Sequence, residues 1–332
     1  MHRLVLTGFL SAMLAALSAE NGLASPLSSR LLPLVPPGAE IVSGFENHPT
    51  LYTHGRLLLS THNNRLDLDD WQALTGVDTR RVFDEVIEVA SAGPDGQLTQ
   101  HLLLVTGRFD RERIFSAAEL NGAGDVEYQG ERILVITPFA RERGDMIDTR
   151  WLVILDNRTG VLGTPGLVQQ ALRRYAGHAL PDPVLQERMT DLRPDVTSWN
   201  VLFASPRSEN NINFKLPHSA WASLQEGADV LLVAAHFGPH IRVDFVVHAQ
   251  SQPDPGFFHR KAAFFTAAFG RNAESPATSD SPELLESRLQ NFSLEAERVQ
   301  GSIEMSHEQF VQWCQQLTLI AAETRLALPR GN

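Results

Sequence analysis

Short apolar runs bounded by glycine, proline or asparagine recur along the chain, and this pattern predicts strands joined by tight turns. Residues 86–105 and 230–247 each contain an apolar run, a Gly-Pro turn and a second apolar run, which predicts a β-hairpin in each place. In the second hairpin, Ile241, Val243 and Phe245 share one face of the strand, which is apolar. Alternation places Arg242, Asp244 and His248 on the other, wetter face. The pattern therefore favours antiparallel sheets.

One short phrase occurs twice, as DDWQALTGVD at 69–78 and SAWASLQEGAD at 219–229. Each copy has a tryptophan, a leucine three residues later, a glycine, and an aspartate two residues after the glycine. In the first copy, Trp71 and Leu74 fall on one face of a predicted helix, and Gly76 ends it.

The acidic residues around the first phrase allow two interpretations. Asp67 or Asp69 is a predicted helix N-cap, and Asp78 is a predicted cap of the next turn. The alternative is a calcium loop, which also includes Asp70. Since the central glycine and distal glutamate of an EF-hand are missing, capping is favoured.

The same elements follow each phrase in the same order, which indicates an internal repeat. After the hairpin, each copy has a helix, a strand that begins Glu-Arg-Ile or Glu-Arg-Val, and a last helix that begins after Thr164 or Ser306. Asp110 is the predicted N-cap of the middle helix in the first copy. Ser306 and Gln309 have the spacing of a capping box.

The fold class predicted from this order is α+β, as a tandem duplication of two units. Each unit is expected to have a mainly antiparallel sheet with helices packed on one face. The predicted organisation is a signal peptide at 1–24, a linker at 25–37, a first unit at 38–182 and a second unit at 183–328.

Composition and charge narrow the function classes. A length of 332 residues with 43% hydrophobic residues suits about two ordinary globular domains. The net charge of −11 argues against binding to nucleic acid, because its phosphates require a basic surface. It also argues against a helix lying on anionic lipid.

The N-terminus has the layout of a secretory signal peptide: Arg3, an apolar run at 4–19, and then small residues. Cleavage is expected after Ala24, with a second choice after Ser18. An uncleaved anchor is the alternative, although the run is short for a bilayer span. The protein is therefore expected in the periplasm or outside the cell, with no membrane span after cleavage.

Histidines provide the best candidate chemistry. His236, His240 and His248 gather near Asp244, and imidazole with carboxylate is an ordinary ligand set for zinc. However, Asp244 and His248 are about 13 Å apart on one strand, too far to share an ion. The metal candidate is therefore limited to His236, His240 and Asp244, and solvated polar residues on a hairpin are the favoured interpretation.

Familiar catalytic motifs are missing from the sequence, including G-x-S-x-G, S-x-x-K, a P-loop and G-x-G-x-x-G after a strand. The single cysteine, Cys314, lies in an apolar helical pattern and is expected to be buried. Polar loops on a rigid scaffold are then the weak candidates for ligand binding. These candidates are Asn63, Asn64, Arg108, Asn210 and Asn211.

The stretch LLPLVPPGAEIVSGF at 31–45, the GRFD corner at 107–110, the helix after it and YQGERILVI at 128–136 resemble uncharacterised bacterial secreted proteins. The resemblance covers most of the first unit and, through the repeat, much of the second. It implies export and α+β repeats, and it transfers no activity and no functional residue.

Together these patterns predict an exported, soluble protein that binds a small ligand or an envelope protein without catalysis and without a cofactor. The alternative is a metal-dependent hydrolase that uses the region of His236, His240 and Asp244. A purely structural envelope component is a third hypothesis.

Overall fold

The computed structural model describes residues 29–46, 68–93, 99–136, 149–203, 227–250, 290–295 and 297–310. The predicted signal peptide at 1–24, residues 219–226 of the second tryptophan phrase, and Cys314 lie outside these ranges. Among the described residues, no helix has the length and apolar character required to span a bilayer.

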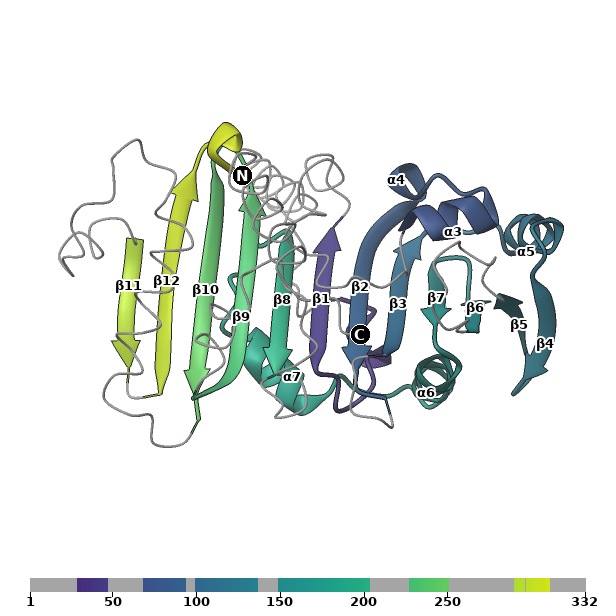
Figure 1. The fold of residues 1–332 in the computed structure, drawn as a ribbon, viewed down its shortest axis with the longest axis horizontal. Coiled ribbons are helices and arrows are strands. Elements are labelled where there is room, and N and C mark those ends of the chain that lie inside the picture. The colour runs from purple at the N-terminus through teal and green to yellow at the C-terminus, as the bar shows by residue number, and fades with distance from the viewer. Residues whose placement is uncertain are drawn as a thin grey trace, which may run out of the picture.

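Within the described residues the strands form one antiparallel sheet of 12 strands, seen from β11 at one edge to β4 at the other in Figure 1. In spatial order they are β11 (Gln290–Glu295), β12 (Arg298–Met305), β10 (Ile241–Ala249), β9 (Ala228–Phe237), β8 (Ser198–Phe203), β1 (Ile41–Glu46), β2 (Phe83–Ser91), β3 (Gln100–Gly107), β7 (Thr159–Gly163), β6 (Arg150–Ile154), β5 (Glu131–Ile136) and β4 (Gly124–Tyr128). The antiparallel pairing and both predicted hairpins, β2–β3 and β9–β10, are confirmed.

The pairing of β1 with β8 joins the two halves of the sheet. Their register places Ile41 opposite Leu202 and Ser43 opposite Asn200. The Ser43 hydroxyl donates a hydrogen bond of 2.6 Å to Oδ1 of Asn200, and both side chains are buried. The expectation of one sheet in each unit is therefore wrong: β1 pairs with β2 on one side and with β8 on the other, which makes one sheet.

Helices pack on both faces of this sheet. One face packs against the short helix η2 (Leu32–Leu34), α6 (Pro165–Ala176) and α7 (Pro183–Met189), and we call it the α6 face. The other face packs against α3 (Leu68–Thr75) and α5 (Arg111–Leu120), and we call it the α3 face.

Successive residues of β3 separate these two faces, as the alternation of a strand requires. Leu102 and Leu104 belong to the core on the α6 face, whereas Leu103 and Val105 belong to the core on the α3 face. The prediction that helices cover a single face is therefore wrong. Strand β3 is apolar on both faces because helices pack against the sheet on both sides of it, as is usual for a buried central strand.

The segment predicted as a linker at 25–37 contributes to the core in its described part. Leu31, Leu32, Leu34 and Val35 are at most 4% exposed and belong to the cluster on the α6 face. The prolines of this segment suggested a linker, but its leucines supply apolar surface that the sheet buries.

Several local predictions are confirmed. Gly76 follows α3 with a positive φ of 66°, a conformation that suits glycine at a helix end. The Asp110 side chain accepts a hydrogen bond from the Arg113 amide at the start of α5. Ser306 and Gln309 make both hydrogen bonds of a capping box. Asp69 lies inside α3 and is therefore not its cap.

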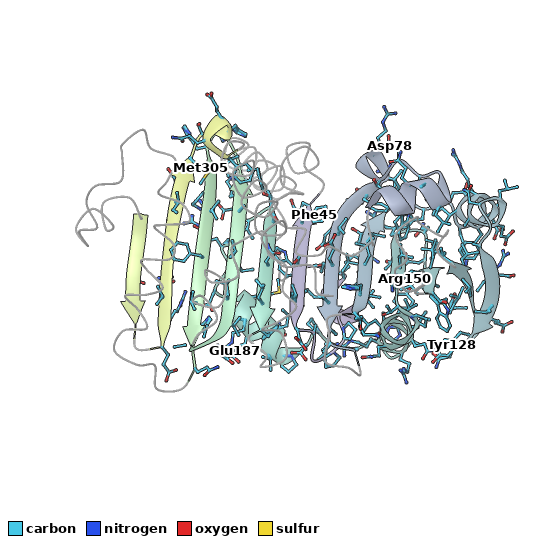
Figure 2. All side chains as sticks on the ribbon, viewed as in Figure 1. Phe45, Asp78, Tyr128, Arg150, Glu187 and Met305 are labelled. Atoms are coloured by element: carbon cyan, nitrogen blue, oxygen red, sulfur yellow. The ribbon has the colours of Figure 1, made fainter. Side chains whose placement is uncertain are left out.

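An aromatic cluster holds α3 against the sheet. Trp71 is fully buried and makes an edge contact with Phe83 at 5.2 Å between ring centroids, and Phe109 lies beside both rings. Short helix α4 (Thr79–Val82) follows, with the Asp78 carbonyl accepting from the amides of Arg81 and Val82. Figure 2 shows Asp78 near this corner of the molecule.

The seam between the halves is packed by Trp199, which is 3% exposed and covers Gly44 on the adjacent strand. A Cβ atom at Gly44 would overlap the indole ring, whereas one at Gly124 would meet no atom within 4 Å. Gly44 is therefore required by a close contact rather than by its backbone conformation.

We predict that Gly44→Ala destabilises the protein by about 1–3 kcal/mol, because the added methyl forces Trp199 or the seam to move. Gly124→Ala is the matched control and should change the free energy of unfolding by less than about 0.5 kcal/mol. Urea unfolding of both variants measures this. Equal stabilities of the two variants would contradict the tight seam.

Candidate functional site

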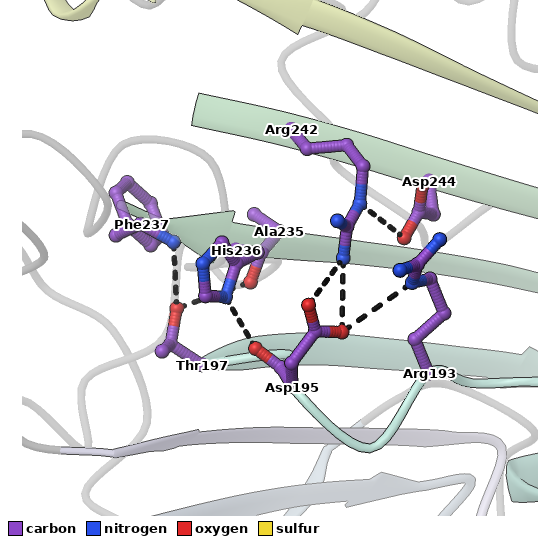
Figure 3. Close-up of polar contacts among 8 residues, drawn as sticks. All are labelled: Arg193, Asp195, Thr197, Ala235, His236, Phe237, Arg242 and Asp244. Atoms are coloured by element: carbon purple, nitrogen blue, oxygen red, sulfur yellow. Dashed lines mark hydrogen bonds and ion pairs between the residues drawn. The ribbon is translucent and has the colours of Figure 1, made fainter. Parts of the chain in front are cut away.

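The loop between α7 and β8, residues 190–197, lies beside β9 and β10 on the α6 face of the sheet. Strand alternation places Arg242, Asp244 and His248 on the same face of β10, as the sequence predicted. His236 of β9 is directly opposite Arg242, so it shares this face. Side chains of the loop and of the two strands meet there (Figure 3).

Arg242 is the centre of this polar cluster. Its Nη2 atom donates to both carboxylate oxygens of Asp195, at 2.9 and 3.1 Å, and its Nε atom donates to Asp244 at 3.1 Å. Arg193 forms a longer ion pair with Asp195, at 3.4 Å. The Arg242 side chain is only 15% exposed, so its charge is compensated mainly by these two carboxylates.

His236 is tied to the same loop through the backbone. Its Nδ1 atom is hydrogen-bonded to the carbonyl oxygen of Asp195, which only accepts, so Nδ1 carries the proton. Beside it, the Thr197 hydroxyl donates to the Ala235 carbonyl at 3.1 Å and accepts from the Phe237 amide at 3.2 Å. These contacts lock the loop to the end of β9.

A second set of ion pairs holds the other end of the loop. Asp191 contacts Nε2 of His248 at 2.7 Å and Nη1 of Arg298, on β12, at 3.1 Å. In α7, Arg188 reaches Asp229 of β9 at 3.5 Å. The loop is therefore fastened to three neighbouring strands, and we call these two sets of contacts the loop clamp.

The carboxylates of the clamp titrate differently because their surroundings differ. Burial alone would raise the pKa of Asp195, but hydrogen bonds from Arg242 and the charges of Arg242 and Arg193 hold it below its ordinary value. The pKa of Asp191 is lowered in the same way against the effect of burial, through His248 and Arg298. Burial raises the pKa of Asp244 more than Arg242 lowers it.

This geometry does not favour a metal ion shared by His236, His240 and Asp244. His240 is exposed beyond the end of β9, and among the described residues it forms no hydrogen bond or ion pair with the cluster. The Arg242 guanidinium already lies between the Asp195 and Asp244 carboxylates, and a cation there would be repelled by it. Among the described residues, no group of three or more metal-ligating side chains gathers anywhere.

A pair of carboxylates that sequence reasoning missed lies at the end of β1 and β2. Glu46 and Glu85 are directly opposite each other, hence on the same face. Burial raises the pKa of both, and the charge of Glu46 raises the pKa of Glu85 further, against a hydrogen bond with Ser29. No local sequence signal marks this pair, because the two residues meet only through the strand register.

The remaining predicted binding residues are not brought together in the described part of the chain. Arg108 is exposed at the corner between β3 and α5, and its amide bonds to the Val82 carbonyl at 3.3 Å. Asn63, Asn64, Asn210 and Asn211 lie outside the described residues. Whether these loops bind a ligand stays a prediction.

Comparison with protein-family models finds no match, and comparison with curated proteins finds none either. Among solved structures, the chain is similar to the protein described as "Structure of crystal form I of TP0453". The similarity has a TM-score of 0.46 and 9% sequence identity, and it covers 88% of this chain and 99% of that one. It carries no argument about function.

We predict that Arg242→Met destabilises the protein by about 2–3 kcal/mol, because it leaves Asp195 and Asp244 without their shared cation. Arg81→Ala is the control: its ion pair with Asp78 is largely exposed and should contribute less than about 0.5 kcal/mol. Urea unfolding at pH 7 compares them. Asp244→Asn should lower the free energy of unfolding less than Asp195→Asn does, because burial disfavours the charge of Asp244. A larger loss in Asp244→Asn would contradict the described clamp.

The Glu46–Glu85 pair predicts a pH dependence. A carboxyl group whose pKa is raised by folding favours the folded state when protonated, so stability falls as pH rises through the unfolded pKa of about 4.3 to the folded value. Glu85→Gln should therefore raise the urea midpoint at pH 7 and leave it nearly unchanged at pH 4. A midpoint that falls at pH 7 would show that ionised Glu85 stabilises the fold.

Proposed function

We propose that this chain is an exported, soluble protein of the periplasm or cell exterior that binds a ligand or an envelope protein without catalysis. The observation that carries the proposal is the use of the charged side chains at the candidate site. Arg242 and Arg193 pair with Asp195, and Arg242 also pairs with Asp244; these ion pairs fasten a loop to the sheet, which is a structural role. A nucleophile, or a free acid–base pair, is not found among the residues of this clamp.

We also propose that the chain is a tandem duplication of units at 38–182 and 183–328. From the seam outward, the strand order is β1-β2-β3-β7-β6 in one half and β8-β9-β10-β12-β11 in the other. In each half a hairpin follows the first strand, and the fourth strand leads into a helix, α6 or the one after Ser306. This order supports a duplication in which β5 and β4 extend the first half.

The binding proposal is supported by the width of the sheet and by the helices packed on it. The antiparallel sheet continues through the seam, and helices brace its first half on both faces. A packed sheet of this kind holds its edges and loops in place, and such loops are where binding residues are commonly found. The metal-dependent hydrolase, with His236, His240 and Asp244, remains the alternative to be tested.

We predict that the full chain, exported by a bacterial host without added metal, has a mature mass beginning near Ser25. Native mass spectrometry should detect a bound molecule that is released unchanged when the protein is denatured. A mass that retains Met1 would contradict cleavage.

Two further outcomes separate binding from catalysis. A metal-sized addition that disappears in the His236→Ala/His240→Ala variant would favour the hydrolase. A bound molecule that is chemically altered after incubation with the protein would also contradict the binding proposal. The Arg108→Ala variant controls for the effect of removing an exposed polar residue elsewhere.

A further inference from the structure

Strand β4 forms one edge of the sheet, and within the described residues it pairs with β5 alone. Four of its five residues, Gly124–Glu127, are exposed, and Tyr128 is half-buried. Figure 1 shows β4 at the end of the sheet, and Figure 2 shows Tyr128 at the same margin. An edge strand offers its outer backbone groups to another extended chain.

The turn that joins β4 to β5 determines which backbone groups face outward. Gln129 and Gly130 both have positive φ, at 54° and 79°, as in a type I′ hairpin turn. In such a hairpin the flanking residues, Tyr128 and Glu131, form a hydrogen-bonded pair. Alternation along the strand then leaves the N–H and C=O groups of Asp125 and Glu127 pointing away from β5.

The side chains on either side of this edge have different chemistry. Asp125 and Glu127 lie on the α3 face, because they are opposite Leu134 and Arg132. Asp125 shares Arg132 with Glu119, whereas Glu127 has no ion pair among the described residues. The outer backbone groups are thus flanked by an excess of negative charge.

The opposite side of β4 is apolar. Val126 is 42% exposed on the α6 face, opposite Ile133 of the core. Tyr128 lies on the same side and packs against Trp151 at 5.8 Å between ring centroids. A strand added at this edge would therefore meet two acidic side chains on the α3 face and an apolar surface on the α6 face.

Charge argues against a second copy of this chain as the added strand. Two antiparallel β4 strands joined through the outer groups of Asp125 and Glu127 would bring carboxylates directly opposite carboxylates. Like charges opposite each other destabilise a strand pair. A partner of opposite charge avoids this repulsion, and its attraction to the acidic edge also speeds association.

We propose that β4 accepts, as an added antiparallel strand, an extended segment of a partner protein with the pattern basic–apolar–basic. The two basic residues pair with Asp125 and Glu127, and the apolar residue between them covers Val126. This inference rests on the proposed binding function and names its partner class and surface. The mode is β-strand addition, in which backbone hydrogen bonds supply affinity and side chains supply specificity.

The test uses the full chain and the peptide Ac-Thr-Val-Lys-Val-Lys-Val-Thr-NH2, with two controls. In one, both lysines are methylated on the backbone nitrogen, which keeps their charge and removes the N–H donors that would pair with β4. In the other, glutamate replaces lysine. Calorimetry should give binding of the first peptide, weakened at least about tenfold in each control.

Two substitutions of one residue separate backbone pairing from charge. Glu127→Pro blocks the outward amide without touching the β4–β5 ladder, and it should weaken binding at least about tenfold. Glu127→Gln removes the charge alone and should weaken binding about threefold. Glu112→Gln, an exposed acid in the first turn of α5, is the control and should bind as the wild type does. Matching urea midpoints check folding, and the peptide controls remain decisive if the proline variant unfolds.

Hydrogen exchange locates the binding: amides of Asp125 and Glu127 should become protected by the peptide. No binding, or binding that survives backbone methylation, overturns the proposal, and so does dimerisation that Glu127→Pro abolishes. If the wild-type exported chain carries a bound molecule but does not bind the peptide, the edge assignment fails and the binding function stands. If the bound molecule is chemically altered, the binding function itself fails.

Discussion

The pairing of β1 with β8 is the contact on which the rest of the architecture depends. Each strand has a partner within its own half, and each would otherwise present an unpaired edge in the middle of the molecule. Their pairing buries Ser43, Asn200 and Trp199, and it turns two smaller sheets into one of 12 strands. The close approach of Gly44 to Trp199 shows how little space this seam leaves, since even a methyl group does not fit.

Features determined by neighbouring residues could be predicted from the sequence, and features determined by distant ones could not. The end of α3 at Gly76, the cap of α5 at Asp110 and the capping box of Ser306 each depend on residues a few positions apart. The order of strands depends instead on which edges meet, and no local pattern encodes this. The same reason explains the misjudged segment before β1, whose leucines are buried by elements more than fifty residues away.

Only part of the candidate site could be predicted from the sequence, for the same physical reason. Alternation along β10 correctly placed Arg242, Asp244 and His248 on one face. The clamp also requires Asp191 and Asp195, which approach from a loop about fifty residues earlier in the chain. Without them, a histidine-rich hairpin suggests metal ligands. With them, the carboxylates are seen to pair with the Arg242 guanidinium instead of a metal ion.

The pairing of β1 with β8 also affects the order in which the chain can fold during synthesis. Glu46, the last residue of β1, is synthesised roughly 150 residues before Ser198, which corresponds to about 8–30 s at typical rates of synthesis. During that interval β1 can pair with β2 but still lacks its second neighbour, so the first half carries a bare inner edge. A nascent chain of this kind gains from staying unfolded, or from a chaperone that covers the edge, until both halves can close together.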